Sequence, residues 1–110
     1  MKGMIKNILL SLAIIDGVQG EIIFPENDIV LNYTHIMFRW LQKPDCNSYN
    51  LVVLNSFDET VLNVHTSDLI HIDKNNLSWD QNYVATLTPI DEDGNVVIPG
   101  DTISFAIGPE

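Results

Sequence analysis

The chain has 110 residues, one cysteine and a formal net charge of −10 at pH 7. This length supports no more than one small domain beside a targeting segment. The acidic charge opposes binding to nucleic-acid phosphates and to anionic membranes, and it favours solubility. A single cysteine excludes an internal disulfide, so packing alone must hold the domain together.

The first twenty residues have the three-part layout of a secretory signal peptide. Lys2 and Lys6 precede the apolar run 8–15, and small or tolerated residues follow at 18–20. The run is shorter than the roughly 20 residues that span a bilayer. Asp16 fits this layout less well, and a buried strand or helix is the alternative. We therefore expect a secreted or periplasmic protein with no stable membrane insertion after signal removal, whose single domain covers residues 21–110.

Apolar residues in this domain recur with period two in short runs between turn residues, which is typical of an all-β sandwich or barrel. No window of a dozen residues shows a helical stripe. A first strand is predicted at 21–24 and continues at 29–32 after the turn 25–28. Further strands are predicted at 36–41, 49–55, 60–65, 69–72 and 83–90, and the last is formed by 96–98 and 102–107. Proline cannot donate to a sheet ladder, so Pro99 is expected at an edge or a bulge.

Several motifs over residues 24–107 together resemble a fibronectin type III domain, in the divergent form of exported bacterial proteins. Phe38-Arg39-Trp40 is similar to the second strand with its core tryptophan, and 48–53 to the third strand with its tyrosine. Leu77 and Tyr83 have the spacing of the tyrosine corner, in which the hydroxyl bonds to backbone a few residues upstream. Residues 89–94 resemble the end of the sixth strand and its turn.

The resemblance implies an immunoglobulin-like or fibronectin type III-like β-sandwich of about seven antiparallel strands. Its structural core would contain five residues: Trp40, Tyr49, Leu77, Tyr83 and Phe105. Trp79 lies in the loop between Leu77 and Tyr83, where it either covers the end of the sandwich or stands exposed as a contact residue.

Cys46 lies in the polar segment 43–47, which is predicted to be a loop. No histidine is close in sequence to activate the thiol, so a nucleophile is not expected. We expect an unpaired surface thiol, and pairing with a second molecule is the alternative.

The sequence offers no recognisable metal or cofactor site. Asp91-Glu92-Asp93-Gly94 suggests a calcium loop, but an EF-hand needs glycine at position six and glutamate at position twelve. Those positions hold Val96 and Thr102, so a plain turn is favoured, with Gly94 at positive φ. The histidines, His35, His65 and His71, fall on different predicted strands, and none has the i, i+2 spacing that two ligands on one strand would share.

No nucleophile elbow, zinc-protease helix or phosphate loop is present, so we do not expect an enzyme. The favoured function is a small, monomeric, exported module that contacts a protein or cell-surface partner through loop tips and a strand edge. Candidate contacts are Trp79, Tyr33, Asp91 and Asp93. The alternative is a structural or spacer domain with no ligand of its own, and a periplasmic metal-binding sandwich is a more distant one.

Overall fold

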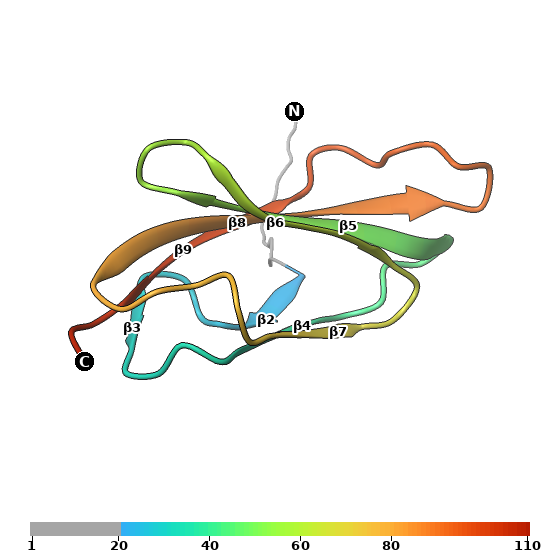
Figure 1. The fold of residues 1–110 in the computed structure, drawn as a ribbon. Helices are drawn as coiled ribbons and strands as arrows, with labels where there is room; N and C mark the ends of the chain where they lie inside the picture. Colours follow the sequence, from blue (N-terminus) through green and yellow to red (C-terminus); the bar gives the residue numbers. More distant parts are fainter. Residues whose placement is uncertain (1–20) are drawn as a thin grey trace, which may run out of the picture.

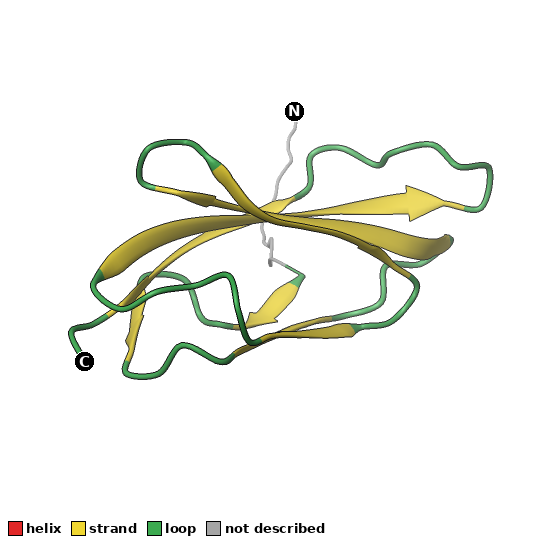
Figure 2. Cartoon of the chain, in the orientation of Figure 1, coloured by secondary structure: helices red, strands yellow, loops and turns green. Residues whose placement is uncertain are grey.

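Two β-sheets pack face to face (Figures 1 and 2). The computed structural model describes residues 21–110, and the signal peptide predicted at 1–20 lies outside them. The described residues contain no helix that is long and apolar enough to cross a membrane. The strands are β2 (Ile22–Phe24), β3 (Ile29–Leu31), β4 (Ile36–Trp40), β5 (Cys46–Asn55), β6 (Thr60–Thr66), β7 (Ile70–Asp73), β8 (Gln81–Asp91) and β9 (Asp101–Ile107).

One sheet has the strand order β2-β4-β7 and the other β3-β9-β8-β5-β6, so the predicted all-β sandwich is confirmed. The described strands number eight rather than about seven. The prediction that all strands are antiparallel is wrong, because β3 pairs with β9 in parallel. The prediction that residues 29–32 continue the first strand is also wrong, because the turn 25–28 does not lead back into the sheet of β2. It carries the chain to the other sheet instead, where the Asp28 amide donates to the Ser104 carbonyl at 2.6 Å.

The core lies between the sheets and contains the five residues that the sequence placed there. Alternation in β4, β5 and β8 directs every second side chain inward. Trp40, 1% exposed, packs against Tyr49 with ring centroids 5.9 Å apart. Tyr83 stacks on Phe105 at 5.5 Å. These rings supply much of the apolar area that stabilises the sandwich.

Two tyrosine hydroxyls fix loops to this core. The Ser78 amide donates to the Tyr83 hydroxyl at 2.8 Å, which is the upstream bond expected of a tyrosine corner, and Leu77 is buried beside it. The Lys43 amide donates to the Tyr49 hydroxyl at 2.9 Å. A buried phenol needs such a partner, because an unbonded hydroxyl costs free energy when it leaves water.

The structure corrects the prediction for Cys46. β5 begins at this residue, not at Tyr49, and pairs it with Asp91 of β8. The thiol is buried, with 4% of the residue exposed, so the expectation of a surface thiol in a loop is wrong. The pairing with β8 extends to Cys46 through a bulge between Cys46 and Ser48. The bulge shifts the alternation by one residue, so that Cys46 is buried and Asn47 is exposed.

Residues 96–98 also differ from the prediction, because they form no strand and contribute only an isolated bridge between Val96 and Ile90. In the preceding turn, the Asp91 carboxylate accepts a hydrogen bond from the Asp93 amide. Pro99, which follows 96–98, has no amide hydrogen to donate to a sheet ladder. The exposed side chains of Val96 and Ile98 therefore extend from a loop between β8 and β9.

We expect the Cys46 thiol to react slowly in the native protein. Burial raises its pKa, and the negative charge of Asp91 adds to the rise, so little of the reactive thiolate forms. Ellman's reagent at pH 8 should label the native chain at least about tenfold more slowly than the chain in guanidinium chloride. Equal rates would contradict the burial. Since the unfolded chain loses this proton first, the free energy of unfolding should fall as pH rises above 9.0, the ordinary pKa of a cysteine thiol.

Candidate functional site

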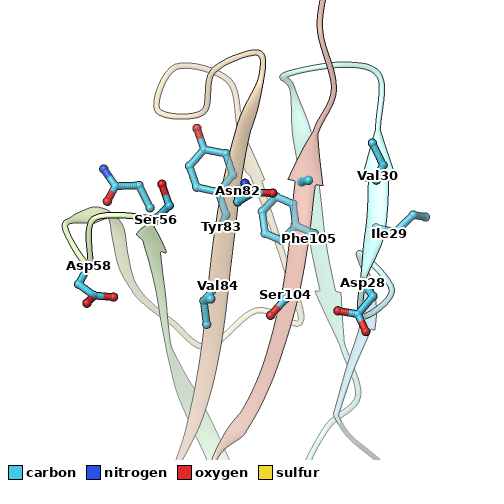
Figure 3. A pocket seen from close by; sticks show the side chains of 12 residues that line it. Asp28, Ile29, Val30, Ser56, Asp58, Asn82, Tyr83, Val84, Ser104 and Phe105 are labelled. Carbon is cyan, nitrogen blue, oxygen red and sulfur yellow. The ribbon is translucent and has the colours of Figure 1, made fainter.

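A groove of about 460 Å³ crosses the outer face of the five-stranded sheet (Figure 3). It lies near one end of the sandwich, over β3, β9, β8 and the end of β5. Val84, Ser104 and Ala106 form its floor, because they alternate with the core residues of β8 and β9. In the close-up, Asp58 lies on one side of Val84 and Ser104, and Asp28 lies on the other.

The wall that carries Asp58 is the β5–β6 hairpin, which is organised around the side chain of Asn55. The Asn55 Oδ1 accepts bonds from the amides of Phe57 at 2.9 Å and Glu59 at 3.0 Å. Its Nδ2 donates to the Glu59 carboxylate at 2.8 Å. Asp58 has a φ of 61°, a left-handed conformation that aspartate tolerates better than most residues. The tip is therefore a hydrogen-bonded turn that holds Asp58 in place.

The wall that carries Asp28 is the segment that joins the two sheets. The Ser104 amide donates to the Asn27 Oδ1 at 2.8 Å, beside the bond from the Asp28 amide to the Ser104 carbonyl. Asp28 also has a left-handed φ, of 66°. Two bonds to β9 thus fix the position of this carboxylate relative to the floor.

The charged side chains that line the groove, Asp28 and Asp58, are both negative. Within residues 21–110, no lysine, arginine or histidine lines it. Among residues 21–110 the only ion pair joins Lys43 to Glu21, at 3.4 Å, so neither Asp28 nor Asp58 has a cationic partner there. An uncharged, partly apolar floor between two carboxylates, on a chain of net charge −10, is suited to a ligand with positive charge.

The contact residues predicted from sequence divide between the two ends of the sandwich. Tyr33, 40% exposed, lies in the β3–β4 loop, and Trp79 in the β7–β8 loop, both at the end of the sandwich where β8 begins. Trp79 is half-buried and packs against the core, as a residue that covers the end of the sandwich would. Asp91 and Asp93 lie at the far end of β8.

The acidic turn and the histidines form no metal site among the residues described. The Asp91 Oδ1 accepts bonds from the amides of Asp93 and Asn95, both at 2.9 Å, and Gly94 has a φ of 85°, so the predicted plain turn is confirmed. Within 21–110 no group of three histidine, cysteine or carboxylate side chains is placed to hold a metal ion. His65 instead bonds to Asn50 across the β5–β6 pair, at 2.9 Å.

Sequence reasoning missed Asp28, Asp58 and Val84, since aspartates in turns are ordinary turn formers and a strand valine is ordinary core. It also missed Phe57, which is 77% exposed at the tip of the β5–β6 hairpin. An aromatic residue in an otherwise polar turn was the one available signal for that segment.

No protein-family model matches the sequence, and no curated protein matches it significantly. The architecture and the groove alone describe the class of this protein: it is a β-sandwich with an acidic-walled groove on its larger sheet.

Proposed function

We propose that this chain is a non-catalytic interaction module with a fibronectin type III-like fold, and that its groove binds a cationic segment of a partner protein. The strand orders β2-β4-β7 and β3-β9-β8-β5-β6 support the fold assignment, as does the bond from Ser78 to Tyr83. The observation that carries the function is that two carboxylates, Asp28 and Asp58, flank an uncharged floor and form no ion pair with any cation in residues 21–110.

The dimensions of the groove suit a short extended segment. Three strand spacings separate β3 from β5, which is roughly 14 Å. In an extended peptide, two lysines separated by one residue have Cα atoms about 7 Å apart, and their long side chains reach outward to both walls. A small apolar residue between them would contact Val84. Exposed ion pairs contribute only about 0.2–1 kcal/mol each, so binding is expected to be weak and reversible.

Export is part of the same proposal, supported by the signal-peptide layout of residues 1–20. Sequencing the N-terminus of the native protein tests it, with a start at Glu21 expected and an intact Met1 against it.

An NMR titration of the full-length, ¹⁵N-labelled protein tests the groove. The probe is acetyl-Gly-Lys-Val-Lys-Gly-amide, and the same peptide with glutamates in place of lysines is the comparison. The lysine peptide should shift the amides of Val84, Ser104 and Ala106, and the glutamate peptide should not. The double variant Asp28→Asn/Asp58→Asn should weaken the lysine peptide about tenfold, since two ion pairs are lost.

The matched control is Asp91→Asn/Asp93→Asn, which removes the same charge at the far end of β8 and should leave the affinity within about twofold, because exposed charges that distant are screened. If both double variants weakened the lysine peptide equally, the peptide would be attracted by the overall charge of the protein, and the proposal that it binds in the groove would be overturned. Absence of any shift would favour the spacer alternative.

A further inference from the structure

Apolar side chains surround Arg39 on the outer face of the three-stranded sheet. β4 buries Ile36, Phe38 and Trp40, so Met37 and Arg39 point outward. In register, Ile72 stands opposite Met37 and Ile70 opposite Arg39. We call this surface the Arg39 face, and it consists of Ile23, Met37, Arg39, Leu41, Ile70 and Ile72. Ile70 and Ile72 are 43% and 53% exposed, and no carboxylate in residues 21–110 forms an ion pair with Arg39.

β7 forms the edge of this face, and its outer backbone groups have no hydrogen-bond partner within residues 21–110. The Trp40 amide donates to the Leu69 carbonyl at 3.0 Å, which identifies Trp40 and Leu69 as a hydrogen-bonded pair in the β4–β7 register. Since such pairs alternate along an antiparallel ladder, Ile70 and Ile72 direct their N–H and C=O groups away from β4. No described strand pairs with that side of β7, and no loop backbone in 21–110 bonds to it.

The edges formed by β2 and β6 are protected in ways that the β7 edge is not. The Ile22 amide of β2 donates to the Asp101 carboxylate at 2.8 Å. β6 has a bulge in its pairing near Leu54 and carries polar, exposed residues such as Asn63. Bulges and polar or charged side chains are common devices against unwanted strand pairing. β7 has no bulge in its register with β4 and no proline, and both outward side chains are isoleucines.

We propose that β7 accepts an added β-strand from a partner protein, an extended segment with an apolar residue opposite Ile72 and a carboxylate opposite Ile70. Strand addition satisfies the free backbone groups, and alternate side chains of the added strand pair with the isoleucines. Arg39 stands on the far side of Ile70, about 10 Å from the added strand, a gap that an arginine and a glutamate side chain together span. A cation that becomes partly covered is best paired with a carboxylate.

This surface is independent of the groove, which lies on the other sheet and favours the opposite charge. A second copy of the chain is the less suitable occupant. It would bring together two molecules that each carry a charge of −10. A two-fold pairing of Arg39 faces would also bring the two Arg39 guanidinium groups close together, where they would repel each other.

The test uses the full-length, ¹⁵N-labelled protein and the peptide acetyl-Thr-Ile-Thr-Glu-Thr-amide, with lysine in place of glutamate as the comparison. We expect the glutamate peptide to shift the amides of Ile70 and Ile72, to slow their hydrogen exchange, and to bind about threefold to fivefold tighter than the lysine peptide. The double variant Asp28→Asn/Asp58→Asn should not alter this binding. A failure of the strand-addition proposal can therefore be distinguished from a failure of the groove proposal.

Two variants separate the backbone from the charge. Ile72→Pro deletes an outward N–H that the β4 ladder does not use, and should weaken the glutamate peptide at least about tenfold. Arg39→Gln should abolish the preference for glutamate while the shifts at Ile70 and Ile72 persist. The Arg39→Gln comparison stands even where Ile72→Pro fails to fold. Equal affinity of the wild-type protein for both peptides, or shifts confined to the groove, would overturn the proposal. So would a concentration-dependent dimer that protects the Ile72 amide without peptide.

Discussion

Replacing Trp40 with alanine is expected to remove about 3–5 kcal/mol from the free energy of unfolding, the usual loss for a large core aromatic. The residue is buried on the inner face of β4 and packs against Tyr49. The hydroxyl of Tyr49 in turn fixes the backbone at Lys43, so a cavity here would also loosen the β4–β5 loop. A domain of this size has a net stability on the order of 5–14 kcal/mol, so the change would remove a large share of it.

Urea denaturation followed by circular dichroism measures this loss, and Trp40→Phe is the matched control. The Trp40 Nε1 is buried and has no hydrogen-bond partner among the described residues. Phenylalanine removes this unsatisfied donor, which offsets part of the lost packing, so a smaller cost of about 1–2 kcal/mol is expected. An unchanged denaturation midpoint for Trp40→Ala would contradict the placement of Trp40 in the core. A cost for Trp40→Phe as large as that for alanine would contradict the expected gain from removing the unpaired indole N–H.

The strands could be predicted because one face of each is buried. Alternation over residues 36–40 and 83–90 places Phe38 and Leu87 inward and Arg39 and Thr88 away from the core, and the structure keeps that assignment. The parallel pairing of β3 could not be predicted, since it is fixed by contacts such as the bond from the Ser104 amide to Asn27, two residues that lie 77 apart in sequence. A local pattern contains no information about which distant strand supplies the partner.

The groove lay beyond sequence reasoning for a related reason. Asp28, Asp58 and Val84 come from three segments, and only the strand order β3-β9-β8-β5 makes them neighbours. Trp79 is an ambiguous residue in the sequence. A tryptophan in a loop can contact a partner or cover the end of the sandwich, and its half-burial against the core agrees with the cover.

Substitutions at Tyr83 should separate the ring from its hydroxyl. Tyr83→Ala is expected to cost about 3–5 kcal/mol, because it removes a core ring stacked on Phe105. Tyr83→Phe keeps the ring and should cost about 1–2 kcal/mol, since the Ser78 amide loses its acceptor. Urea denaturation measures both losses.

Hydrogen exchange then locates the effect of the hydroxyl. In Tyr83→Phe the Ser78 amide should exchange faster, because its acceptor is gone, while the Val84 amide on the groove floor should be unchanged relative to global stability. Tyr49→Phe is the matched control, since it removes an equivalent hydroxyl and should speed exchange at Lys43 only. An unchanged Ser78 amide in Tyr83→Phe would mean that the hydroxyl does not hold the loop. Because Val84 follows Tyr83 directly on β8, acceleration at both amides would mean that the corner also maintains the floor of the groove.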